Sequence, residues 1–273
     1  KRGILASIGL VLLDSLWFEK YVIDWNYFDI SKLEKDKIKI IQISDLHFDQ
    51  LRYLHKSIAE KINSIKPDLI FITGDSVDKT EKIESLNDFL QLIDNSIKKY
   101  AITGNWEYWG KVDLTKLKNT YSKNNCELLI NENRTISIKN REISIIGIDD
   151  LVGGNADFEK AVENLKQTET NIVLSHCPEY RDIITKKKEN LNIDLVLSGH
   201  THGGQITFLG IAPFKPQGTK PKTPKEQAKS DARKAKDKEE IQIMLDDDFI
   251  ADVISYSISK EEAQMRIGKF LNS

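Results

Sequence analysis

The sequence contains little cysteine, almost no net charge and no visible internal repeat. Its two cysteines, Cys126 and Cys177, exclude a disulfide framework, and we expect each to be a buried reduced thiol. Forty basic residues against 42 acidic ones leave a net charge of −2. A dedicated nucleic-acid-binding protein carries a basic excess on one face, so we expect no nucleic-acid partner.

A hydrophobic run long enough to span a membrane is also missing. The apolar stretch from Ile4 to Leu13 is interrupted by Asp14, and a spanning helix needs about 20 apolar residues. The first residue is not Met, so a membrane anchor that starts upstream and an uncleaved signal-like segment are two alternatives. An amphipathic helix, packed on the domain or lying on a membrane, is the third. We expect an apolar segment over 1–30 with membrane contact through residues 3–23, and a cytoplasmic protein otherwise.

Short runs of β-branched residues begin at Ile38 and alternate with helical patterns. Such near-continuous apolar runs are typical of strands covered on both faces. Alternating strands and helices indicate an α/β fold built from βαβ units. A local hairpin is predicted over 135–146, with Asn140 in its turn. Strands are predicted within 38–45, 67–75, 98–105, 142–150, 170–176 and 193–200, and helices within 51–66, 81–97, 113–123, 157–167 and 179–189.

The composition changes after the main domain, which we place at 31–214. Residues 215–240 are rich in lysine and have almost no apolar side chains, which favours a solvated linker or a disordered run. Contact of this run with anionic lipid or nucleic acid is an alternative, weakened by its interspersed acidic residues. In the tail, 241–273, the stretch "FIADVISYSIS" is a candidate strand.

Metal-binding residue types follow the main apolar runs. Four of the five histidines come directly after such a run, whereas His55 lies on a helical pattern, where a solvated or capping role is expected. Ligands of parallel sheets bind beyond the carboxyl ends of the strands, so these loops can converge. Carboxylate, amide and imidazole ligands together suit Mn²⁺, Fe or Zn²⁺. Seven ligands exceed the needs of one ion, which indicates two ions that share a carboxylate. The candidate ligands are Asp45, His47, Asp75, Asn105, His176, His200 and His202.

The ordered motifs "DLH", "GDSVD", "GNWE", "SH" and "GHTHGGQ" lie within residues 38–214. This series resembles the motifs of the calcineurin-like metallophosphoesterases, and is nearest the bacterial phosphodiesterase-type members that carry an N-terminal membrane segment. The resemblance implies a two-sheet β-sandwich flanked by helices, with a binuclear metal centre at the strand ends. It also implies a phosphoester substrate, of which nucleotide-linked and lipid-linked phosphodiesters are candidates.

The resemblance assigns roles to the candidate ligands. Asp75, Asn105 and His176 are the expected catalytic residues, and Asp78 is expected to support a ligand or cap a turn. Two ions about 3.5–4 Å apart acidify a shared water, and the bridging hydroxide then attacks phosphorus. No covalent enzyme intermediate is required, in accord with a sequence that has no nucleophile elbow. The first ion is assigned Asp45, His47 and His202, the second Asn105, His176 and His200, and Asp75 bridges both.

Two features depart from the family pattern. The usual loop reads Gly-Asn-His-Asp/Glu, but this chain has Trp106, whose indole cannot act as a general acid. Three alternatives follow: substrates with good leaving groups, a proton from Glu107 or from metal-bound water, or a site with little turnover. "WEYW" either stacks a base or sugar or forms a packed aromatic rim, and we expect Asn105, Trp106 and Glu107 to bind substrate.

The second departure is the tail, which stops matching the family pattern at about residue 218. A sheet edge stays open unless 241–258 supplies a strand.

The predicted function is therefore binuclear metal-dependent phosphoester hydrolysis, with diesters favoured over monoesters. The alternative is a weakly active or inactive scaffold that binds metal or ligand, because Trp106 replaces the usual histidine.

Overall fold

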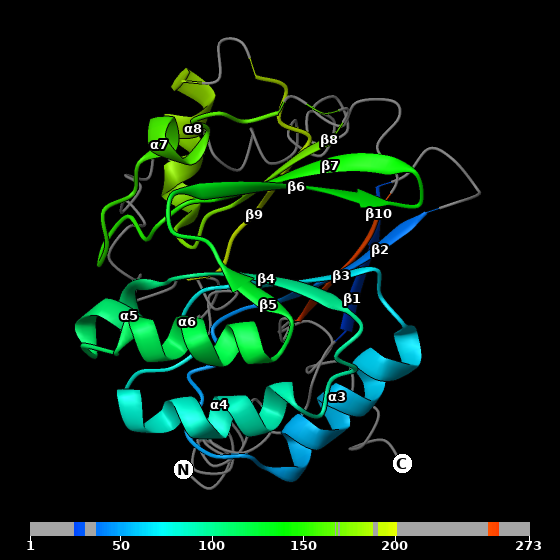
Figure 1. Cartoon of the computed structure of the whole chain (residues 1–273), viewed down its shortest axis with the longest axis vertical. Helices are drawn as coiled ribbons and strands as arrows, with labels where there is room; N and C mark the ends of the chain where they lie inside the picture. The colour runs from blue at the N-terminus through cyan, green and yellow to red at the C-terminus, as the bar shows by residue number, and fades with distance from the viewer. Residues whose placement is uncertain are drawn as a thin grey trace, which may run out of the picture.

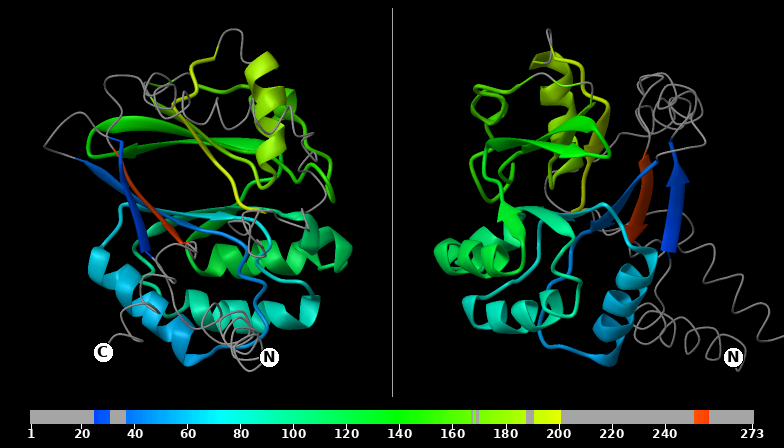
Figure 2. Two further views of the ribbon diagram at one scale, coloured as in Figure 1. Left: turned by 180° about the vertical axis from the view of Figure 1, so that it is seen from behind. Right: turned by 45° about the vertical axis from the view of Figure 1, so that its right-hand side comes forward.

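The computed structural model describes residues 25–30, 37–166, 168, 170–187, 191–200 and 251–256. Two β-sheets pack face to face, and helices cover the outer face of each sheet (Figure 1). Two further views show the same layers, with α7 (Phe158–Ala161) and α8 (Arg181–Lys187) on one side and α3 (Tyr53–Ile65), α4 (Ile83–Leu90) and α6 (Leu114–Lys123) on the other (Figure 2). This is the two-sheet sandwich that the resemblance implied. Residues 1–24 of the N-terminal apolar segment, the lysine-rich run and His202 lie outside the described residues, and the end of that segment, Trp25–Asp29, is a strand.

Six strands form the first sheet, in the order β1-β10-β2-β3-β4-β5. All neighbouring pairs are parallel except β1 and β10, which are antiparallel. β10, which lies within the stretch 241–258 predicted as a possible strand, is placed between β1 and β2. The strands are β1 (Trp25–Asp29), β2 (Ile38–Ile43), β3 (Leu69–Thr73), β4 (Lys98–Ile102), β5 (Cys126–Leu128) and β10 (Ala251–Tyr256).

The second sheet has the order β6-β7-β8-β9. β6 (Glu132–Ile138) and β7 (Arg141–Gly147) form the predicted hairpin, and β7, β8 and β9 are parallel. Its turn residues, Lys139 and Asn140, have φ of 48° and 64°, as a two-residue type I′ turn requires. β8 (Thr170–Leu174) and β9 (Leu195–Leu197) complete the sheet.

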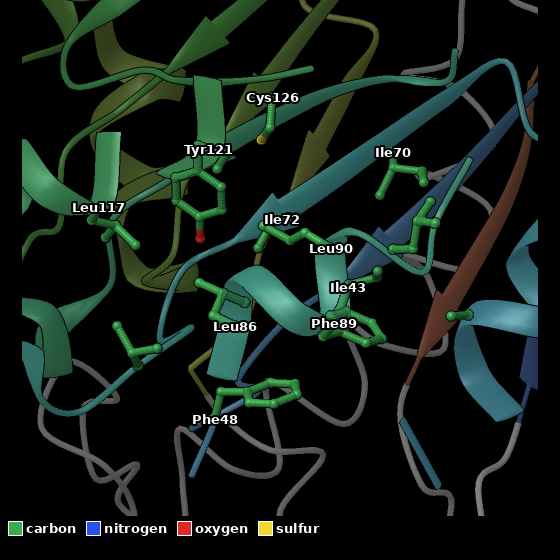
Figure 3. Packing of buried hydrophobic residues seen from close by; sticks show 14 of the residues in the cluster. Ile43, Phe48, Ile70, Ile72, Leu86, Phe89, Leu90, Leu117, Tyr121 and Cys126 are labelled. Carbon is green, nitrogen blue, oxygen red and sulfur yellow. The ribbon is translucent and has the colours of Figure 1, made fainter. Parts of the chain in front are cut away.

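Three apolar clusters hold the layers together. One lies under α3, α4 and α6 and includes Phe48, Phe89 and Tyr121 (Figure 3). The second fills the space between the sheets, and the third lies under α7 and α8. Cys126 and Cys177 are buried and free, as predicted. The helices are α3 (Tyr53–Ile65), α4 (Ile83–Leu90), α5 (Asn105–Trp109), α6 (Leu114–Lys123), α7 (Phe158–Ala161) and α8 (Arg181–Lys187), with short 3₁₀ turns η2 (Thr80–Lys82) and η3 (Pro178–Tyr180).

Two helices are shorter than predicted. α4 ends at Leu90, and a turn follows in which the Asp94 side chain accepts a hydrogen bond from the Ser96 backbone N–H (2.9 Å). Ile93 and Ile97 lie beyond the end of α4 but are still buried. Their spacing continues the apolar pattern of the helix, which is why the sequence predicted a longer one. α7 ends at Ala161 because the chain then enters a turn. Asn164 in this turn has a left-handed φ of 55°, which no α-helix contains. In the described part of the chain, no helix has both the length and the apolar character to span a membrane.

Candidate metal centre

The described candidate ligands lie at the carboxyl ends of five strands that come from both sheets. Hydrogen bonds join the two sheets at this point: the His200 backbone N–H donates to both Asp45 carboxylate oxygens at 3.0 Å. The loops therefore converge as the parallel strand pattern predicted. Asp45 and His47 follow β2, Asp75 follows β3, Asn105 follows β4, His176 follows β8 and His200 follows β9.

Two sets of three ligands meet here. The buried set is Asp75, His176 and His200, and the outer set is Asp45, His47 and Asp75. Within each set, one ligand atom per residue lies within 4.8 Å of the others. Asn105 adjoins the buried set, since its Oδ1 lies 2.9 Å from His200 Nδ1. Asp75 is thus common to two adjacent groups of metal-binding side chains.

His176 provides the sharpest test of whether the site fits a cation. Its Nδ1 lies 2.7 Å from the Thr73 carbonyl oxygen. An Nδ1–H that donates to this carbonyl leaves a lone pair on Nε2. Nε2 is buried and makes no hydrogen bond among the described residues, although it lies 3.2 Å from Asp75 Oδ2. A lone pair beside a carboxylate oxygen needs a proton or a metal ion between them, so the site fits a cation.

His176 and Asp75 each favour the charged form of the other. Burial disfavours the charged imidazolium, but the neighbouring carboxylate of Asp75 outweighs it and raises the pKa of His176 to about 9. Burial also works against an ionised Asp75, yet His176 and the Trp106 backbone N–H bring the pKa of Asp75 below its ordinary value. A divalent ion at Nε2 would displace this proton, because a histidine ligand must be deprotonated.

Asp78 orients the histidine of the outer set. Its Oδ1 lies 2.6 Å from His47 Nδ1, while His47 Nε2 lies 3.8 Å from Asp75 Oδ2. A carboxylate on one ring nitrogen fixes the tautomer and directs the other nitrogen toward a metal. This contact is the supporting role that the sequence suggested for Asp78.

The backbone is strained at four of the candidate ligands. Left-handed φ values are uncommon outside glycine and cost roughly 1–3 kcal/mol each, and they cluster at functional sites. Gly74, with φ of 91°, has no room for a side chain, because an added Cβ would lie 2.6 Å from His176 Nδ1. The strained ligands are Asp45 (54°), His47 (41°), Asp75 (51°) and His200 (70°).

The segment "NWEYW" forms the short helix α5, which begins directly after Gly104. Glu107 of this helix is 1% exposed. Burial, and next the charge of Asp75, raise the pKa of Glu107 to about 7. We predicted substrate contact for Glu107, but its carboxylate instead ties the loop after β3 to the loop after β4. It accepts hydrogen bonds from the backbone N–H groups of Asp75, Ser76, Val77 and Gly104 at 2.6–3.3 Å.

Trp106 lies at the rim of the outer set. Its backbone N–H donates to Asp75 Oδ1 at 2.8 Å, which holds the rotamer of the shared carboxylate. The indole is 40% exposed and its ring centroid lies 5.9 Å from that of His47. The side chain is thus partly exposed beside the outer ligand set.

The sequence reasoning missed the role of Asp149. This buried carboxylate accepts hydrogen bonds from the Thr103 hydroxyl (2.7 Å) and the Tyr108 hydroxyl (2.5 Å), and so braces both ends of the segment that carries Asn105. Asp149 follows β7 as the candidate ligands follow their strands. The same strand-end pattern would have identified it.

Comparison with known proteins assigns the family. Residues 38–204 match the calcineurin-like phosphoesterases. YpbG of Bacillus subtilis is 31% identical to this chain over 69% of the chain and 70% of its own length. The metallophosphoesterase YkoQ of the same organism is 31% identical over 63% of each chain, so the match spans less than two thirds of YkoQ. A metallophosphoesterase of Aquifex aeolicus is 33% identical over 70% of this chain and 72% of its own length. Since the matched range contains both ligand sets, this chain belongs to the calcineurin-like phosphoesterase family.

Proposed function

We propose that the protein hydrolyses phosphodiesters, in preference to monoesters, with two divalent ions bound in the two ligand sets. The observation that carries the proposal is the position of Asp75, which is common to both sets. The buried, unbonded Nε2 of His176 supports it. The mixture of carboxylate, imidazole and amide donors suits Mn²⁺, Fe or Zn²⁺. We propose a nucleotide-linked or lipid-linked substrate, and the membrane contact of residues 3–23 also stands as a proposal.

Each described residue has a defined part in this proposal. When bound, the ions would polarise the phosphoryl oxygens and acidify a water molecule. The Thr73 carbonyl and Asp78 fix the tautomers of the two histidines. The Asn105 amide, whose oxygen lies 2.9 Å from His200 Nδ1, would contact the substrate phosphate as well as a metal. The proposed ligands are Asp45 and His47, with His202, for one ion, Asn105, His176 and His200 for the other, and Asp75 for both.

The indole of Trp106 motivates the first prediction. Without a general acid, the wild-type rate should fall steeply as the leaving group becomes more basic. In Trp106→His, an imidazole can protonate the leaving oxygen, so we expect a gain of about 10²–10⁴-fold on the poorest leaving group. The measurement is kcat/KM for a series of aryl phosphodiesters with the Mn²⁺-loaded protein, alongside p-nitrophenyl phosphate as the monoester.

Equal slopes for wild type and Trp106→His would contradict a missing general acid. Faster hydrolysis of p-nitrophenyl phosphate than of bis-p-nitrophenyl phosphate would contradict the diester preference. If neither protein hydrolyses any ester while metal is bound, the scaffold alternative holds instead.

The second prediction concerns Asp78. Asp78→Asn replaces the carboxylate that holds His47 Nδ1, and loss of such a partner typically weakens metal binding about 10–100-fold. We expect the Mn²⁺ concentration required for half-maximal activity to rise by this factor. The exposed Asp182 provides the matched control, Asp182→Asn. An unchanged Mn²⁺ requirement in Asp78→Asn would show that His47 does not depend on this contact.

A further inference from the structure

Helix α5 has a buried polar side and an exposed aromatic side. Asn105 and Glu107 are buried beside the metal centre, whereas Trp106 is 40% and Trp109 is 47% exposed. Neither tryptophan belongs to the three apolar clusters of the described residues. Packing of the fold therefore does not account for these two large side chains, and paired exposed aromatics often mark a binding surface.

The two indoles form a corner. Their ring centroids lie 5.6 Å apart with an angle of 70° between the planes. A flat ring can stack on the face of one indole while its edge meets the other, an arrangement that aromatic rings favour. An alkyl chain or a puckered sugar has no aromatic face with which to use both surfaces. The corner therefore favours a planar aromatic group over other apolar groups.

The corner starts beside the outer ligand set. The Trp106 ring meets the His47 ring at 87° with 5.9 Å between centroids. The Trp106 backbone N–H is bonded to Asp75, the residue common to both sets. A ligand that places a phosphate at the ligand sets and carries a planar ring nearby would engage both features.

We infer that Trp106 and Trp109 bind the nucleobase of a nucleotide-class phosphoester whose phosphate lies at the metal centre. The inference rests on the proposed function for the position of the phosphate. Every nucleobase offers a flat π-face, and stacking on an aromatic side chain contributes about 5- to 150-fold in affinity by alanine substitution. The pair thus selects for a base without reading its identity.

Two esters that share a leaving group provide the first test. Thymidine 5′-(p-nitrophenyl phosphate) carries a base, and methyl p-nitrophenyl phosphate does not. We expect Trp109→Ala to lower the ratio of their kcat/KM values (thymidine ester over methyl ester) about 5- to 150-fold. Tyr53→Ala is the control, because Tyr53 is an exposed aromatic residue on a different helix. A ratio that is the same in wild type and Trp109→Ala overturns the inference.

Equilibrium dialysis provides a second test that does not depend on turnover. The Mn²⁺-loaded wild type should bind AMP more tightly than ribose 5-phosphate, and Trp109→Ala should lose most of that difference. Equal affinities for the two ligands in the wild type overturn the base-binding site. If AMP binds more tightly but neither ester is hydrolysed, the proposed function fails while the base-binding site stands.

Discussion

Asp75→Asn should reduce Mn²⁺-dependent hydrolysis of bis-p-nitrophenyl phosphate by about 10²–10³-fold, the loss expected when a group that organises transition-state charge is removed. Asp75 is the only residue common to the two ligand sets in the described part of the chain. The substitution therefore takes a negative charge from both. Asparagine keeps an oxygen for the Trp106 backbone N–H, which now bonds Asp75 Oδ1 at 2.8 Å, so the local fold should survive.

Metal analysis should accompany the kinetics. Asp75→Asn should retain little metal, whereas His47→Ala, which alters only the outer set, should retain more. Asp88→Asn on α4 is the matched control, because Asp88 is an exposed aspartate outside the site. Wild-type metal content and activity in Asp75→Asn would refute a shared carboxylate.

The largest effect on stability is expected for Glu107→Ala. The substitution leaves four backbone N–H groups without their acceptor in a buried position. A buried donor left unsatisfied costs about 1–3 kcal/mol. Because water can enter the space left by the side chain and satisfy some of the donors, we expect a total loss of about 3–5 kcal/mol. Glu107→Gln keeps the shape and one oxygen, and its loss should be intermediate.

Urea unfolding measures this loss as a change in the free energy of unfolding. Glu60→Ala, at an exposed position of α3, is the control for loss of a glutamate. Activity should fall together with stability in Glu107→Ala, because Glu107 holds the backbone of Asp75 and of the loop before Asn105. If the variant is as stable as wild type, Glu107 does not tie the two loops together.

Much of the layered architecture could be predicted from local patterns. The parallel strands carry short runs of β-branched and other apolar residues, and the hairpin has Asn140 at its turn, so both carry their own signal. The pairing of β10 with β1 and β2 has no local signal, because it depends on segments more than 200 residues apart. α5 was missed because it has five residues and three are aromatic, which gives it little intrinsic helix preference. Hydrogen bonds that the Glu107 carboxylate accepts from surrounding backbone N–H groups hold it instead.

The candidate ligands could be predicted because each follows a strand, and parallel strands bring such residues to one edge. The supporting contacts could not. The Thr73 carbonyl contacts His176, which is 103 residues away in sequence, and Asp149 contacts Tyr108. Both contacts depend on how the two sheets pack. Glu107 shows the limit most clearly, because a carboxylate beside a candidate ligand has the same sequence signature whether it faces a substrate or the backbone.

The candidate ligands come from both halves of the sandwich: Asp45 and Asp75 from one sheet, His176 and His200 from the other. A small slide of one half past the other would change every distance between these pairs. The apolar cluster between the sheets, which includes Phe71 and Leu174, therefore acts as the spacer that sets the size of the site. We expect a larger or smaller side chain in that layer to change the distances between the ligands of the two sheets without replacing any ligand.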